Sequence, residues 1–115
     1  MDDTEFPRLD EILRQNTINA ERYAIARRKA AEAKYYLDVL IGAGYLDGTL
    51  EEKTAYEKVL IIIASKSDDN KKTYKELIIS TAEYKGLEKV LEINSEQIRW
   101  AQSKMKYNLD GEING

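Results

Sequence analysis

The feature that most constrains the fold is an apolar heptad near the C-terminal end of the chain. Large apolar residues recur every seven positions without a gap, at Leu77, Tyr84, Leu91, Ile98 and Met105. A seven-residue period places side chains along one face of an α-helix, where they pack against another helix. The heptad therefore predicts one long helix over about 71–107, and we expect these five residues to form the seam of a homo-oligomer.

Self-association follows from the length of this predicted helix. A helix of about 37 residues extends about 55 Å at 1.5 Å per residue. A compact chain of this size has a radius of gyration of only about 13 Å. One molecule cannot cover such a helix along its whole length, unless the helix breaks at Gly86.

Three further helices are predicted upstream, joined by short polar or glycine-containing breaks. Pro7 suits the first turn of a short helix that ends near Asn16. A longer helix should run over 17–43 and stop at Gly42 and Gly44. The segment Thr49-Leu-Glu-Glu52 matches a capping box and predicts a helix over 49–66. The polar residues 67–70 offer N-cap candidates for the long helix that follows.

Residues 59–64 are open to two interpretations. The stretch is apolar on every side and rich in β-branched residues, so it fits a buried strand as well as a buried helix. We prefer a helix, because the charged run before it lacks the alternation of a strand.

The sequence as a whole predicts an all-α protein. We expect a helical bundle of three main helices plus a short N-terminal helix, with the heptad on the long C-terminal helix. Residues 1–109 should form a single helical domain, and 110–115 should be a disordered tail, because they show no periodicity. The chain contains one proline among 115 residues, so few positions interrupt a helix.

Composition argues against catalysis. The chain has no cysteine and no histidine, which removes the thiolate ligands, the usual general base and the commonest metal ligand. We expect no enzyme activity, no cofactor and no metal, although a hydrolase with an all-carboxylate metal site remains as a third interpretation. The first residues lack a signal-peptide pattern and no apolar run approaches a membrane span, so we expect a cytoplasmic protein that contacts no membrane.

A local basic surplus is the strongest functional signal. The chain carries a net charge of −3, but residues 14–34 hold six basic residues against two acidic ones. Basic side chains on a rigid helix can meet successive phosphates, and a neighbouring tyrosine can stack on unpaired bases. The candidate nucleic-acid-binding residues are Arg22, Arg27, Arg28, Lys29, Lys34 and Tyr35. An ordinary solvated helix face that pairs with nearby glutamates fits the same pattern equally well.

Trp100 lies off the heptad and is a candidate for a protein interface. Stacking on a base and packing beneath the first short helix are the alternatives.

The arrangement resembles small helical accessory proteins of tailed phages. The resemblance covers roughly residues 20–107 and lies in the long helix reaching Lys34-Tyr-Tyr-Leu37, the turn over 45–53, and the closing helix over 84–103. Among named families the chain is most similar to the UvsY-type recombination mediators. That resemblance implies helical protomers that assemble into a ring, bind single-stranded DNA and help to load a recombinase.

The sequence therefore leaves two hypotheses for the function. The first is a phage-type recombination or replication accessory protein that binds single-stranded DNA and a partner such as a recombinase as a homo-oligomer. The second is a protein-only interaction module, for example a small inhibitor or adaptor that docks on a host or phage protein.

Overall fold

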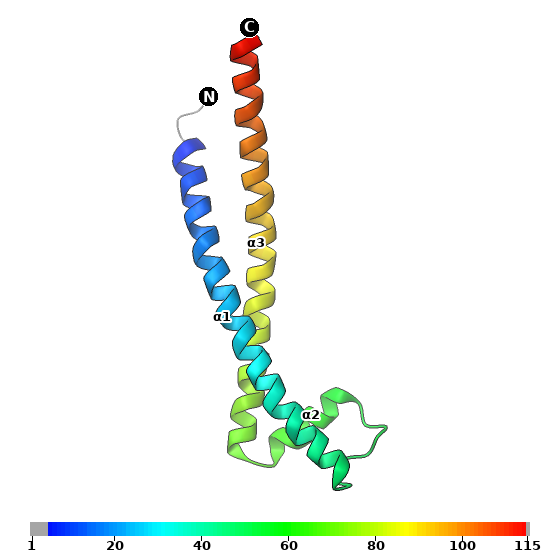
Figure 1. Cartoon of the computed structure of the whole chain (residues 1–115). Coiled ribbons are helices and arrows are strands. Elements are labelled where there is room, and N and C mark those ends of the chain that lie inside the picture. The colour runs from blue at the N-terminus through cyan, green and yellow to red at the C-terminus, as the bar shows by residue number, and fades with distance from the viewer. Residues whose placement is uncertain (1–4, 115) are drawn as a thin grey trace. The chain divides into compact units, whose positions relative to one another are not determined.

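The computed structural model describes residues 5–114, with side chains described for residues 8–107. It consists of α1 (Glu5–Leu46), α2 (Tyr56–Ser65) and α3 (Asp68–Asn114), which Figure 1 labels. The all-α prediction is confirmed, because residues 5–114 contain no strand. None of the helices in this range is long and apolar enough to cross a membrane.

The break predicted near Asn16 is wrong, because α1 is one continuous helix of 42 residues. The hydroxyl of Thr17 donates a hydrogen bond to the carbonyl oxygen of Leu13 at 3.1 Å, inside the helix, where a capping threonine would instead accept one from a backbone N–H. Pro7 lies in the first turn of α1, where its missing N–H costs nothing. Residues 5–114 therefore form three helices, without a separate short N-terminal one.

The helix predicted over 49–66 is much shorter than expected. α2 spans only Tyr56–Ser65, and residue 55, which precedes it, makes no side-chain capping bond. Thr49 serves a turn: its hydroxyl lies 2.7 Å from Oδ1 of Asp47, and its N–H donates to the same oxygen at 2.9 Å. This local bond replaces the capping box. Residues 59–64 are helical, so the preferred interpretation of that stretch is confirmed.

The final helix is longer than predicted at both ends. Ser67 caps α3, because its hydroxyl oxygen accepts a hydrogen bond from the N–H of Asn70 at 3.0 Å. α3 continues through Gly86 without a break. It ends at Asn114 and so includes residues 110–114, which were expected to lack structure; Gly115 lies outside the described residues.

The contacts divide the chain into two compact units, which we describe separately. The central unit comprises Ala24–Tyr84, and the terminal unit comprises Met1–Tyr23 together with Lys85–Gly115.

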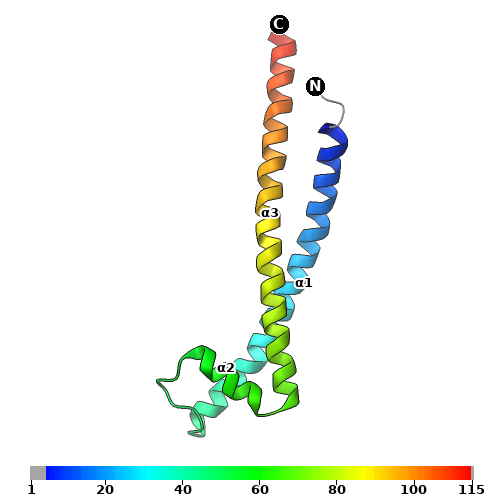
Figure 2. The same ribbon diagram turned by 180° about the vertical axis from the view of Figure 1, so that it is seen from behind.

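The central unit holds the hydrophobic core. α2 lies against the C-terminal part of α1 and the N-terminal part of α3 (Figures 1 and 2). The buried cluster consists of Leu37, Ile41, Leu50, Val59, Leu60 and Ile63. Tyr74 and Leu77 of α3 pack against it. Earlier in α1, the small buried residues Ala26, Ala30 and Ala33 line its inward face.

Asn70 joins all three helices within the central unit. Its side-chain amide donates to the carbonyl oxygen of Ile63, near the end of α2, at 2.9 Å. Its side-chain oxygen accepts a hydrogen bond from the hydroxyl of Tyr36 on α1 at 3.3 Å. Because α2 is only 10 residues long, such anchoring contributes to holding it in place.

The turn after α1 depends on two glycines. Gly48 has φ of +79°, a backbone conformation that other residues adopt only with strain. Gly44 lies so close to the core that an added Cβ would be 2.6 Å from Cδ1 of Leu50. These glycines allow the chain to reverse and place Leu50 in the buried cluster.

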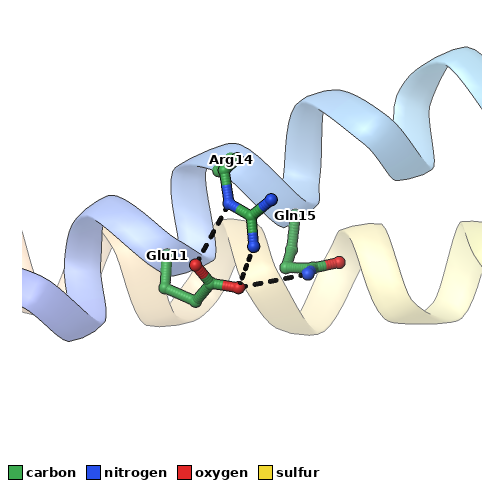
Figure 3. A network of polar contacts seen from close by, with 3 residues as sticks. All are labelled: Glu11, Arg14 and Gln15. Carbon is green, nitrogen blue, oxygen red and sulfur yellow. Dashed lines mark hydrogen bonds and ion pairs between the residues drawn. The ribbon is translucent and has the colours of Figure 1, made fainter.

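The terminal unit is a pair of antiparallel helical segments with little interior. Among its described side chains only Leu87 is buried. Polar contacts lie on its surface: Arg14 donates to Glu11 at 2.6 Å and Gln15 donates to the same carboxylate at 3.2 Å (Figure 3). Two packed helices alone bury few side chains completely, because each helix covers only one face of the other.

Candidate interaction surfaces

The predicted nucleic-acid-binding residues all lie on α1, but they do not form one surface. Arg22 belongs to the terminal unit and the other five belong to the central unit. Residues seven apart on a helix share one stripe to within about 20°. Arg27 and Lys34 therefore share one stripe and Arg28 and Tyr35 share another, while Lys29 lies about 100° of rotation beyond Arg28.

Several of these basic groups contact neighbours within the chain. The guanidinium of Arg27 lies 5.4 Å from the ring centre of Tyr84, in a cation–π contact. Nε of Arg28 is 4.0 Å from the carboxylate of Glu32. Both contacts lie within the central unit, and the Arg28–Glu32 pair is of the kind that the solvated-face alternative describes.

Lys34 takes part in a small network between α1 and α2. Its ammonium group is 3.0 Å from Oδ2 of Asp38, and the hydrogen bond and charge of that carboxylate raise the pKa of Lys34. The hydroxyl of Tyr56 donates to the other oxygen of Asp38 at 3.2 Å. Partial burial, followed by the charge of Asp38, raises the pKa of Tyr56. Lys34 therefore has a structural partner that DNA would have to displace.

Lys29 and Tyr35 are the most available members of the predicted set. Tyr35 is 73% exposed, and Lys29 has no ion pair within the described part of the chain. The neighbouring Tyr36, in contrast, is tied to Asn70.

The heptad residues of α3 face α1 of the same chain where their contacts are described. In the central unit Leu77 and Tyr84 line one groove with Ala30. In the terminal unit Leu91 lines another with Tyr23. Ile98 and Met105 are half-buried. Leu77, Tyr84 and Leu91 therefore lie beside α1 of the same chain.

A lysine-flanked groove is a further surface feature of the central unit. Its volume is about 550 Å³, and it lies between the end of α2 and the first turns of α3. Ala64, Tyr74 and Ile78 form its apolar part, and Asp68, Lys71, Lys72 and Lys75 border it. The lysines stand out in the sequence as a basic set, but the groove depends on the packing of Ala64 from another helix. A second local signal is Ile78, an isoleucine just outside the heptad.

Trp100 lies in the terminal unit and is 65% exposed. It borders a cavity of about 310 Å³ together with Arg8, Leu9, Ile12, Gln97 and Ala101. The ammonium group of Lys104 is 5.0 Å from the centre of its ring. Trp100 therefore borders a cavity beside the first turns of α1, while most of its surface is exposed.

Within the described residues no three carboxylates lie close enough together to hold a metal ion. Comparison with protein-family models, with curated proteins and with solved structures gave no match.

Proposed function

We propose that the chain is a protein-interaction module that docks on an acidic, amphipathic segment of a partner protein. The observation that carries this proposal is the lysine-flanked groove of the central unit. Its apolar part would accept the partner's apolar side chains, and Lys71, Lys72 and Lys75 would meet its carboxylates. With three lysines against Asp68, the border of the groove has a positive balance, although residues 24–84 as a whole carry ten basic and ten acidic residues.

Exposure of apolar residues supports an interaction role. Of the 34 large apolar side chains in residues 8–107, 17 are exposed, which is half of them. Single exposed apolar residues are normal on a protein surface, but so large a share favours a protein that covers them by association. A cytoplasmic setting, as the sequence suggests, fits such a role.

Two adjacent isoleucines provide a matched test. Ile78 lines the groove and is 51% exposed, whereas Ile79 lies outside it and is 64% exposed. The tagged chain would be used to capture partners from cells that naturally make it, with nuclease added. We expect one stoichiometric protein that survives nuclease, is lost with Ile78→Glu and is retained with Ile79→Glu. If both variants retained the partner, or both lost it, the assignment of the binding site to the groove would be contradicted.

Single-stranded DNA binding is the second candidate. One observation favours it: the exposed guanidinium of Arg28 and the exposed ring of Tyr35 share a stripe of α1, about 10 Å apart along the helix. This pairing of a phosphate contact with a stacking ring is common at single-strand sites. It would fit the mediator role that the resemblance to UvsY-type proteins implies.

The salt dependence of binding tests whether the chain binds single-stranded DNA. Affinity for a single-stranded oligonucleotide should fall with salt, with a log–log slope of about −0.7 for each phosphate contacted. Arg28→Ala should reduce that slope by about 0.7, whereas Lys58→Ala, on α2, should leave it unchanged. Absence of binding at low salt would remove this candidate.

A further inference from the structure

The terminal unit has an apolar strip on α3 that is distinct from the heptad. Alternating steps of three and four residues define this outer strip, which consists of Gly86, Val90, Ile93, Gln97, Trp100, Lys104 and Tyr107. Its four large apolar side chains are all exposed, from 41% at Val90 to 79% at Tyr107. A helix with one apolar stripe against its neighbour and a second one outward has two faces to cover.

The two sides of the terminal unit differ in character. On one side, Gln97 and Trp100 of the outer strip line the 310 Å³ cavity together with Leu9 and Ile12 of α1. On the other side, the surface groove near Tyr23 is lined mainly by polar residues, which are Glu88, Glu92, Ser95, Glu96 and Arg99. The helix pair is therefore a layer with one apolar and one polar side.

Such a layer is half of a helical bundle. Helices pack in at least two layers around a shared interior, and the terminal unit provides one layer with only Leu87 buried among its described side chains. A second pair of helices placed on the apolar side would bury the outer strip.

We propose that the apolar side of the terminal unit binds the same side of a second copy of this chain, forming a two-fold symmetric four-helix bundle. The available area is sufficient. From Gly86 to Tyr107 the strip is about 32 Å long, and two helices with axes about 9 Å apart form a layer nearly 20 Å wide. Because α1 covers only part of that length, each copy contributes about 500 Å², and the pair reaches the roughly 1,000 Å² that is the lower limit for a specific interface.

The charge of the strip fits a copy of itself. Lys104 is the one charged residue of the outer strip, and its ammonium group lies over the ring of Trp100, so two copies would bring few like charges together. A strip with a single charged residue also offers little attraction to a strongly charged partner. In a two-fold interface the same patch must complement itself, which a near-neutral strip with apolar side chains along its length can do.

Gly86 leaves room for close approach by another helix. It lies inside α3, with no positive φ, and an added Cβ would have no atom within 4 Å. No neighbour among the described residues requires a glycine there. On the outer strip, however, a residue without a side chain lets a neighbouring backbone come near.

The test uses the intact chain and its single tryptophan. Sedimentation equilibrium should show a mass twice that of one chain as concentration rises. Over the same range Trp100 should lose accessibility to acrylamide, because the proposed interface covers it. Ile93→Glu should shift the association to at least tenfold higher concentration while the helical circular dichroism is unchanged. Gln102→Glu is the matched control, because Gln102 is exposed and lies seven residues after Ser95 on the polar side; it should associate like the unmodified chain.

This inference shares with the proposed function only the assumption that exposed apolar residues mark a surface of association. The outcomes of the test distinguish the two. A chain that stays monomeric at millimolar concentration overturns the second copy, even if it captures a partner protein through the central groove. A doubled mass with unchanged quenching of Trp100 also overturns it, because the contact would then lie elsewhere. A dimer that buries Trp100 but captures no partner supports the inference and removes the proposed function.

Discussion

At the scale of single residues, Asn16 and Asn70 show how hydrogen bonding decides what an asparagine contributes. Asn70 is buried, and its side chain bonds to Ile63 and Tyr36. Oδ1 of Asn16 is also buried, but it accepts no hydrogen bond from any described residue. A buried polar atom without a partner costs about 1–3 kcal/mol, whereas a satisfied one is neutral or stabilising.

The same substitution at the two positions should therefore act in opposite directions. Asn70→Ala should lower the free energy of unfolding by about 1–3 kcal/mol, because the carbonyl of Ile63 loses its side-chain donor. Asn16→Ala should raise it by about 1 kcal/mol, because alanine removes the unpaired oxygen and favours the helix. Urea denaturation measures both. If Asn16→Ala lowered the free energy of unfolding as much as Asn70→Ala does, this account would be contradicted.

Asp47 gives a prediction for pH. The hydroxyl of Thr49, followed by its N–H, lowers the pKa of Asp47 from its ordinary value of 3.8. A carboxyl whose pKa is lowered by folding adds stability above its unfolded-state pKa and loses it as pH falls through the folded-state value. Asp47→Asn should therefore be less stable than the unmodified chain at pH 7, and the difference should shrink below about pH 4. Unfolding curves at pH 7, 4 and 2.5 test this; a difference that is constant with pH would contradict it.

At the scale of elements, the long helices contain glycines with different physical roles. A methyl group at Gly86 would meet open space, whereas at Gly44 it would lie 2.6 Å from Cδ1 and 2.8 Å from Cγ of the buried Leu50. Sequence alone treats both as helix-weakening residues. Only the packing of Leu50 distinguishes them.

Alanine at the two glycines should therefore separate propensity from packing. Gly86→Ala should stabilise the dilute, monomeric chain by up to about 1 kcal/mol, because alanine favours the helix. Gly44→Ala should destabilise it by about 1–3 kcal/mol, because Leu50 must move. Thermal and urea denaturation at low protein concentration provide the measurement. Stabilisation by both variants would show that Leu50 adjusts without cost.

At the scale of the whole molecule, the two units differ in how much they bury. The central unit contains the six-residue core cluster, including Leu37, whose exposure is 0%. The terminal unit has only Leu87 buried among its described side chains. Local stability follows buried apolar contact, so the two units should open with different free energies.

Hydrogen exchange tests this difference directly. In dilute solution, amides in residues 8–23 and 88–107 should exchange at least tenfold faster than amides near Leu37 and Leu77, which corresponds to about 1.4 kcal/mol or more. Raising the protein concentration should slow exchange in the terminal unit if a second copy covers it. Uniform protection at low concentration would contradict the unequal burial.

Local sequence patterns determined that this chain is helical and roughly where its long helices lie. The heptad period predicted most of α3, and the lack of strand alternation in the charged run before residues 59–64 favoured a helix there, because such patterns act over a few turns. The same local rules misplaced boundaries at Asn16 and Thr49. There, threonines bonded to Leu13 and Asp47 in ways that their residue types permit equally well.

Only the tertiary structure decided which helix faces are covered. Leu77 and Tyr84 lie beside α1 of the same chain, so this part of the stripe that the sequence assigns to an oligomer faces a helix of its own chain. The lysine-flanked groove needs Ala64 beside Ile78, and Asn70 needs Tyr36, 34 residues away. An apolar stripe on a helix indicates that another surface covers it but does not identify that surface. The free energy gained by burying the stripe is about the same against any surface that excludes water.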